Sequence, residues 1–212
     1  MRIDPFTDAL NFLFHSALWW IFVILVVASL VIAAVNLARD ESQRNIKDIA
    51  TYALRFFIGC MWWQQTLWKL PPTYTDLPDG SGGLRYWVSK MVTGAAFSWH
   101  SDFVQNIVLP HFLLFAPLVY AAEVFIGISL MLGLAMRFGA LLGALMAINL
   151  WLGLYRTPNE WPWTYFFLIV VQLLFVIYHA GRSLGADALI RERLREAGTS
   201  ADWRSRLLAL VT

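Results

Sequence analysis

The sequence is poor in the residues from which resident redox and metal centres are built. It contains one cysteine, Cys60, among 212 residues. A single cysteine excludes an internal disulfide, a four-cysteine iron–sulfur cluster and covalently attached c-type haem. The histidines lie at no spacing that brings two of them onto one metal ion; they are His15, His100, His111 and His179. We therefore expect no metal site and no covalently bound cofactor, so any redox chemistry needs a diffusible or partner-held group.

Charge is also scarce. Only 14% of the residues are charged, 59% are hydrophobic, and the chain has eleven Trp, fifteen Phe and seven Tyr. A soluble domain of this size needs more charge on its surface, so the composition indicates that lipid surrounds much of the chain. The net charge of +2 is small, and nothing in the sequence suggests nucleic-acid binding.

Five apolar stretches are predicted to form membrane-spanning helices. A helix needs about 20 mostly apolar residues to cross the hydrocarbon. The stretches are residues 17–37, 49–68, 110–134, 138–155 and 163–178. The residues before the first stretch form a poor secretory signal, because the positive charge of Arg2 is offset by Asp4 and Asp8. We therefore interpret the first stretch as an uncleaved anchor.

The predicted domains follow from these stretches. Residues 1–48 form an N-terminal anchor helix with a charged linker, 49–188 a four-helix membrane domain, and 189–212 a cytoplasmic amphipathic tail. In the long outer loop, apolar residues recur at helical spacing from Leu84 to Trp99. This pattern predicts an amphipathic helix at the membrane interface.

The distribution of positive charge predicts the orientation. With the N-terminus outside, ten Lys and Arg residues fall on the cytoplasmic side and five on the outer side, as the positive-inside rule favours. Seven tryptophans then lie near outer helix ends, where aromatic rings anchor: Trp19, Trp20, Trp62, Trp63, Trp68, Trp161 and Trp163. We expect a multi-pass protein of a bacterial or archaeal cytoplasmic (inner) membrane, with its C-terminus in the cytoplasm.

Two ionisable residues interrupt the predicted spans. Glu123 lies near the middle of 110–134, and Arg55 lies about two turns from the inner end of 49–68. A charge at the bilayer centre costs at least about 2.5–3.5 kcal/mol. Because the two spans are antiparallel neighbours, we expect Arg55 and Glu123 to pair. Alternatively, Arg55 extends to the inner surface, and Glu123 is protonated or bonded to Gln64, Asn149 or Gln172.

Three segments resemble the DoxX-like membrane proteins. "LRFFIGCMWWQQTLWKL" (54–70) is similar to their Arg-x-x-x-Gly…Lys-Leu first helix. "AEVFIGISLMLGLAMRFGALLGA" (122–144) is similar to their Glu-x-x-x-Gly…Leu-Gly-Leu-x-x-Arg segment. "HAGRSLGADA" (179–188) resembles their closing Gly-x-Gly-Arg…Asp motif, with Ala180 where Gly is common. The resemblance covers about residues 52–188, and the family includes DoxD, the small subunit of thiosulfate:quinone oxidoreductase.

The resemblance implies a fold and a role. The fold is an all-α integral membrane bundle of four helices, to which 17–37 would be an addition. The role is that of a membrane subunit in a quinone-linked oxidoreductase complex, at most part of a quinone-reducing enzyme. Quinone, membrane lipids and other membrane subunits are the expected partners. The positions that match the family motifs are Arg55, Gly59, Lys69, Glu123, Gly127, Gly133, Arg137, Gly181, Arg182 and Asp187.

The candidate site residues have two interpretations each. The Arg55–Glu123 pair either contacts a quinone headgroup, with Glu123 as proton acceptor, or fixes the helix register. A group of outer tryptophans either walls a quinone pocket or anchors in the interface, and anchoring explains most of them; the group is Trp62, Trp63, Trp68, Trp87, Trp99, Trp161 and Trp163. The surface that we expect to face quinone or substrate consists of Lys69, His111, Trp63, Trp68 and Asn149.

A second function competes with the first. The chain is then a non-redox structural accessory subunit of a large respiratory or photosynthetic membrane complex. It would dock through 17–37 and through a ridge of small residues, Ala135, Gly139, Gly143 and Ala147, although such ridges more often serve packing within one bundle. A small transporter ranks lower, because the sequence has no pair of Gly- or Pro-interrupted helices in corresponding halves.

Overall fold

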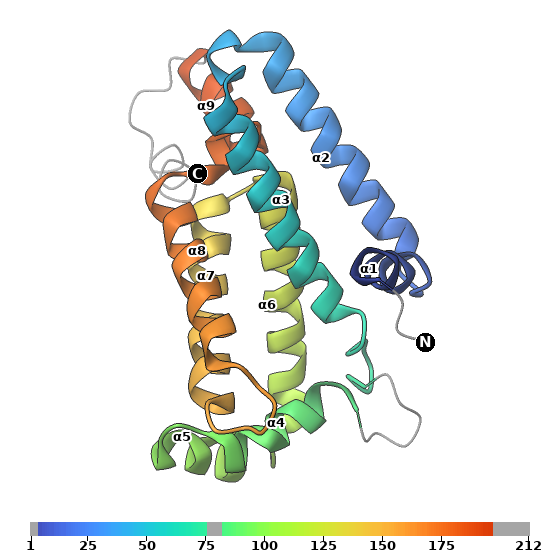
Figure 1. Cartoon of the computed structure of the whole chain (residues 1–212), viewed down its shortest axis with the longest axis vertical. Helices are drawn as coiled ribbons and strands as arrows, with labels where there is room; N and C mark the ends of the chain where they lie inside the picture. The colour runs from blue at the N-terminus through green and yellow to red at the C-terminus, as the bar shows by residue number, and fades with distance from the viewer. Residues whose placement is uncertain (1–3, 76–81, 197–212) are drawn as a thin grey trace.

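The computed structural model describes residues 4–75 and 82–196, and within these ranges every regular element is helical. Figure 1 shows their arrangement. In chain order the elements are α1 (Pro5–Phe14), α2 (Trp19–Arg39), η1 (Glu41–Gln43), α3 (Ile46–Thr66), α4 (Gly83–Gly94), α5 (Ser98–Phe103), the π-helix η2 (Val104–Val108), α6 (Phe112–Leu132), α7 (Met136–Leu154), α8 (Pro162–Ile177), η3 (Ala180–Arg182) and α9 (Ala186–Glu196).

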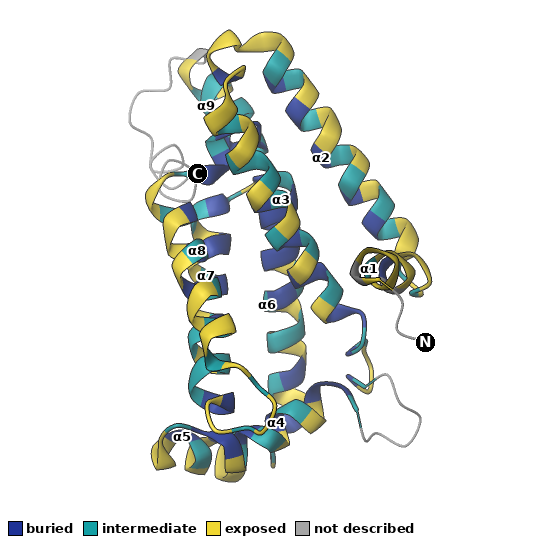
Figure 2. Cartoon of the chain, viewed as in Figure 1, coloured by how far each residue is buried: buried dark blue, intermediate teal, exposed yellow. Residues whose placement is uncertain are grey.

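Four helices form the bundle, and α2 is added to its outside. α3 packs along α6, α7 packs along α8, and α6 contacts α7, while α2 lies against α6 (Figure 1). The helix faces that meet are buried and the outward faces are exposed (Figure 2). Ile126, Leu130 and Met136 have no exposed surface and mark the centre of the core. α4 and α5 lie across one end of the bundle (Figure 1).

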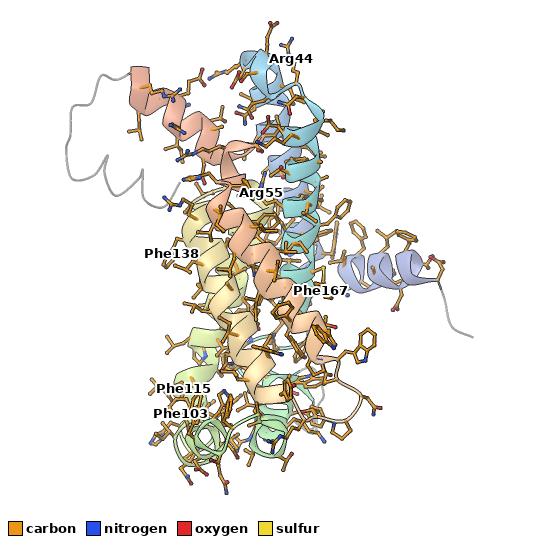
Figure 3. All side chains as sticks on the ribbon, turned by 60° about the vertical axis from the view of Figure 1, so that its left-hand side comes forward. Arg44, Arg55, Phe103, Phe115, Phe138 and Phe167 are labelled. Atoms are coloured by element: carbon orange, nitrogen blue, oxygen red, sulfur yellow. The ribbon has the colours of Figure 1, made fainter. Side chains whose placement is uncertain are left out.

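The composition of the helices confirms an all-α membrane protein. Among the described residues, α2, α6 and α7 are long and apolar enough to cross a bilayer. α8 is apolar but has 16 residues, and α3 has 21 residues but contains Lys47, Asp48 and Arg55. Apolar side chains such as Phe138 and Phe167 point outward, with 51% and 63% of their surface exposed, as in contact with lipid (Figure 3). The predicted count of five spans stays a prediction.

Two glycines set the register between α3 and α6. A Cβ atom on Gly59 would lie 2.7 Å from the backbone nitrogen of Met131, and a Cβ on Gly127 would lie 3.2 Å from that of Trp63. The two backbones therefore approach closely at both points, which only a residue without a side chain permits. This register places Arg55 beside the end of α6 and not beside its middle.

We expect Gly59→Val to destabilise the protein by about 1–3 kcal/mol, because the added carbons must push α6 away from α3. The measurement is an unfolding titration in detergent followed by circular dichroism. Ala50→Val, on an exposed position of the same helix, is the control and should change little. Equal stability of the two variants would contradict the close approach of α3 to α6.

The turn between α6 and α7 is held by charged groups from two other elements. The Asp187 carboxylate accepts hydrogen bonds from the backbone N–H groups of Ala135 (2.8 Å) and Met136 (2.9 Å), and so caps α7. Arg55 donates from Nη1 to the carbonyl oxygens of Leu130 and Met131 at the end of α6. These bonds satisfy the backbone carbonyls at the end of α6 and the backbone N–H groups at the start of α7, which have no partner within their own helix.

Asp187 should make the stability of the folded protein depend measurably on pH. Burial raises the pKa of Asp187 to about 6, although the two backbone N–H groups and Arg55 oppose the rise. The folded state thus binds this proton more tightly than the unfolded state. The stability that the protonated Asp187 gives to the folded state is fully present below about pH 4 and is lost as the pH rises through 6. We expect Asp187→Asn to flatten the stability profile between these values, as measured by thermal unfolding. An unchanged profile would exclude Asp187 as the titrating group.

The segment before α9 joins the N-terminal elements to the bundle. Asn36 of α2 donates to the carbonyl of Gly185 (3.1 Å), and the amide oxygen of Gln43 accepts from the N–H of Leu184 (2.7 Å). Ser183 donates from its hydroxyl to Asp48 at the start of α3 (2.5 Å). The added helix α2 is therefore fastened by specific polar contacts as well as by apolar packing.

The structure shortens the predicted amphipathic helix and adds a helix that was not predicted. The amphipathic helix predicted through Trp99 ends at Gly94, because residues 95–97 are extended before α5 begins. α1 was not predicted, although Asp4 followed by Pro5 is a recognisable helix start. Residues 197–212 of the predicted amphipathic tail lie outside the described residues. The small-residue ridge serves the bundle itself, since Gly139 faces Ser129 of α6 and Gly143 faces Gln172 of α8.

Candidate functional site

A cavity of about 730 Å³ lies at the end of the bundle that α4 and α5 cover. Its wall is formed by α3, α4, the α5–η2 segment, α6, α7 and the start of α8. Phe103 and Phe115, which line it, lie at the opposite end of the molecule from Arg44 (Figure 3). The volume is in the range of about 300–1,000 Å³ that is typical of sites for small organic ligands.

Most of the cavity wall is apolar. The bundle helices contribute Trp62, Val119 and Leu150, and the amphipathic helix α4 contributes its buried face, including Val88 and Met91. The polar side chains that reach the cavity are Gln65, Lys69, Glu123, Asn149, Glu160, Thr164 and Tyr165. A small number of polar groups in an apolar wall is the usual composition of a site that orients an uncharged ring.

Lys69 and Glu123 form a buried ion pair in the wall of this cavity. The Lys69 Nζ lies 2.6 Å from Oε1 and 2.5 Å from Oε2 of Glu123, and each side chain is 4% exposed. The chain turns back after α3 ends at Thr66, which brings Lys69 to the middle of α6. The ammonium also lies 4.4 Å from the centre of the Trp68 ring, a cation–π distance.

The predicted pairing of Arg55 with Glu123 is wrong. Arg55 is fully buried, but its partners are the carbonyl oxygens at the end of α6. The register set by Gly59 and Gly127 brings the C-terminal end of α3 to Glu123, so that Lys69 is the residue within reach. An unpaired charge in the bundle would cost free energy, and Glu123 does have a buried cationic partner. This partner, Lys69, comes from the loop after α3.

Two further polar pairs contribute to the cavity wall. The Nε2 atom of His100 lies 3.1 Å from Oδ1 of Asn149, and the Tyr165 hydroxyl donates to Oε2 of Glu160 over 2.6 Å. Trp62 also lines the cavity, and its buried Nε1–H finds no acceptor among the described residues. Leaving this buried N–H without an acceptor is costly.

The structure brings together some of the predicted site residues. Lys69, Trp68, Glu123 and Asn149 all line the cavity. Trp63 is buried in a different cluster, against Phe22 and Leu25 of α2. His111 is exposed just before α6, with its Nδ1 2.9 Å from the carbonyl oxygen of Ile107. These last two residues do not belong to the cavity.

Sequence reasoning missed Gln65, Glu160 and Tyr165 as cavity residues. Helical spacing gave a usable signal for the first, since Gln65 stands between Trp62 and Lys69 at intervals of three and four residues. Glu160 and Tyr165 gave none, because they stand in a short loop and at the start of α8, whose position depends on the tertiary fold.

Most residues that match the family motifs lie away from the cavity. Gly59 and Gly127 lie at the α3–α6 contact, and Gly133 adopts a left-handed conformation where a Cβ would come within 2.8 Å of the Arg55 guanidinium. Gly181 packs against Asp187. Arg137 and Arg182 lie at the other end of the bundle, on α7 and η3. Lys69 and Glu123 are therefore the motif residues with access to a ligand.

The described residues contain no group of three or more His, Cys, Asp and Glu side chains that could hold a metal ion. The comparison with protein families gives a match to the model described as "TQO small subunit DoxD", over residues 50–208. The comparisons with curated proteins and with solved structures give no match. The family match includes α3 to α9 and hence the helices around the cavity, but begins after α2.

Proposed function

Because the chain belongs to the DoxD family, we propose that it is a membrane subunit of a thiosulfate:quinone oxidoreductase complex and that its cavity receives the quinone headgroup. The observation that carries this proposal is the buried Lys69–Glu123 pair in the wall of a largely apolar cavity. Burying a charged pair costs free energy, and buried ionisable pairs are often found at sites of proton transfer.

The chemistry of the wall suits a quinone. A quinone has a flat apolar ring and two carbonyl oxygens that accept hydrogen bonds. Aromatic and aliphatic side chains such as Trp87 and Met91 provide surface for the ring. The Lys69 ammonium in the cavity wall is a donor for a carbonyl oxygen. The fit rests on this donor together with the apolar wall.

Reduction of a quinone to the quinol takes up two electrons and two protons. The described residues contain no group of three or more His, Cys, Asp and Glu side chains that could hold a metal ion. We assign the electron-donor site, which oxidises thiosulfate, to a partner subunit. The part of this chain is to hold the ring and to supply protons. Lys69 carries a proton at Nζ, and Glu123 keeps that ammonium oriented and charged. Tyr165 and Glu160 form a second hydrogen-bonded pair on the wall, in which the Tyr165 hydroxyl carries the proton and the Glu160 carboxylate accepts.

The proposed location is the cytoplasmic membrane, with the N-terminus outside. In this orientation the cavity opens toward the outer side, because its wall contains the outer loop elements α4 and α5. Thiosulfate is a small anion that is available outside the cell, and the cavity end is where a partner carrying its site would dock. The α2 helix would then serve as an additional membrane anchor.

Binding of a soluble quinone analogue to the purified full-length chain tests the proposal. We expect saturable quenching of tryptophan fluorescence, since Trp62, Trp68 and Trp87 line the cavity. Lys69→Gln and Glu123→Gln should each weaken binding by about tenfold or more, because each removes one charge of the pair. Lys47→Gln and Glu41→Gln change the same residue types on exposed positions and are the controls.

Two results would overturn the quinone assignment. One is quenching that rises without saturation in the wild-type protein. The other is equal affinity of the wild type and of cavity variants that elute as folded protein in size-exclusion chromatography. Co-purification with a respiratory or photosynthetic core, without quinone binding, would instead favour the accessory-subunit function.

A further inference from the structure

A second group of charged residues lies at the end of the bundle opposite the cavity. Arg137 is in the first turn of α7, Arg182 ends η3, and Arg191 and Arg195 lie one turn apart on α9. η3 packs against α7, α8 and α9, so the four residues lie on elements that meet at this end of the bundle (Figure 1). We refer to these four residues as the arginine cluster. Three of them, Arg137, Arg182 and Arg191, are half-buried.

The arginine cluster has too few partners among the described residues. The Nε atoms of Arg137 and Arg182 are buried and find no acceptor there. The nearby carboxylate of Asp187 already accepts from two backbone N–H groups of α7. Glu192, on the same helix as Arg191, lies 4.0 Å from Arg39 of α2. Half-buried guanidinium groups without acceptors lack an anion.

The charges in the arginine cluster repel one another. Burial, Arg191, Arg137 and Arg195 lower the pKa of Arg182, and Asp187 opposes this effect. The neighbouring His179 responds in the same way, since burial together with Arg182 and Arg137 lowers its pKa. A bound anion would remove both penalties, because it neutralises charge and supplies hydrogen-bond acceptors at the same point.

Exposed apolar side chains lie next to the arginine cluster. Leu134 and Phe138 flank Arg137 in the sequence and have 39% and 51% of their surface exposed. Ile177 and Tyr178, just before η3, have 64% and 68% exposed. Figure 3 shows Phe138 pointing away from the bundle on α7. An anionic group at the cluster would therefore have apolar surface beside it, as an acyl chain requires.

We propose that the arginine cluster binds the phosphate headgroup of an anionic phospholipid, whose acyl chains lie along Phe138 and Ile177. Arginine forks match phosphate oxygens in geometry as well as in charge. Free inorganic phosphate has the same headgroup chemistry but gains nothing from the adjacent apolar side chains. This inference is independent of the quinone cavity, since the two sites lie at opposite ends of the bundle.

Native mass spectrometry of the full-length protein in detergent tests the lipid site. We expect phosphatidylglycerol to bind at least about tenfold more tightly than phosphatidylcholine, with a preference that weakens as salt is raised. Arg182→Gln combined with Arg191→Gln should abolish the preference. Arg44→Gln combined with Arg193→Gln removes the same charge outside the cluster and should preserve it.

Three outcomes would overturn the proposal. They are equal binding of the two lipids by the wild-type protein, an unchanged preference in the cluster variant, and displacement of phosphatidylglycerol by millimolar inorganic phosphate. The last outcome would identify a free-anion site in place of a lipid site. The wild-type comparison decides the question even if the cluster variant fails to fold.

Discussion

Lys69→Met is expected to reduce the free energy of unfolding by about 3–5 kcal/mol. The substitution leaves the Glu123 carboxylate in a nearly closed environment, where 4% of its side chain is exposed, without its cationic partner. An unpaired buried charge costs far more than the net gain from the pair itself. The measurement is unfolding of the purified protein in mixed micelles by increasing amounts of a denaturing detergent.

The double variant Lys69→Met with Glu123→Leu provides the decisive comparison. Because it removes both charges and keeps the volume apolar, we expect it to recover most of the lost stability, and to lose quinone-analogue binding all the same. Coupling between the two substitutions then measures the interaction. Additive effects would mean that the two side chains do not interact in the protein, and the site as described would be wrong.

Arg55→Met should cost on the order of 3 kcal/mol, the second largest effect. The guanidinium donates to the carbonyls of Leu130 and Met131, and a methionine of similar length leaves both oxygens buried without a donor. Fully buried acceptors at a helix end carry the full cost of lost hydration. Thermal unfolding in detergent is the appropriate measurement.

The control for Arg55 is Arg44→Met. Arg44 pairs with Glu41 over 3.0 Å at an exposed position, so its loss should cost less than about 1 kcal/mol. Gly133→Ala gives an independent check, since a Cβ there would come within 2.8 Å of the Arg55 guanidinium. If Arg55→Met and Arg44→Met proved equally mild, the end of α6 would not depend on Arg55.

The family and the class of fold were predictable from the sequence because each depends on local patterns. Apolar runs of helical length identify membrane helices, and the motifs around Arg55, Glu123 and Asp187 identified the relatives. The need of Glu123 for a buried polar partner was also predictable, since it follows from the cost of an unpaired charge in hydrocarbon.

The identity of that partner was not predictable, because it depends on register. Counting residues from the helix ends put Glu123 near the middle of its span and Arg55 about two turns from the inner end, from where it was expected to reach Glu123. Contacts at Gly59 and Gly127 decide instead which residues of α3 and α6 meet. Lys69 was expected to face quinone or substrate, but its pairing with Glu123 was not predicted. Its burial depends on a turn after Thr66 that directs the chain back toward α6.

The cavity likewise depends on tertiary packing. Periodicity predicted the apolar face of α4, and the structure turns that face toward α6 and α7 at the end of the bundle. Tyr165 and Glu160 reach the cavity through the position of α8, for which the sequence gives no distance constraint. Trp62 and Trp63 are adjacent in the sequence but contact different clusters, which only the rotation of α3 decides.

The hydrogen bonds around Asp187 also determine when the α6–α7 turn can be completed during synthesis of the chain. Ala135 and Met136 take their capping partner from a residue about fifty positions later, and Asn36 and Gln43 bond the segment just before it. During translation, the apolar helices α2, α6 and α7 are synthesised before residues 183–187. The hairpin of α6 and α7 must therefore wait, with its turn incompletely bonded, until the last helices have been synthesised. Truncation before Ser183 would yield inserted helices that lack the contacts that join them.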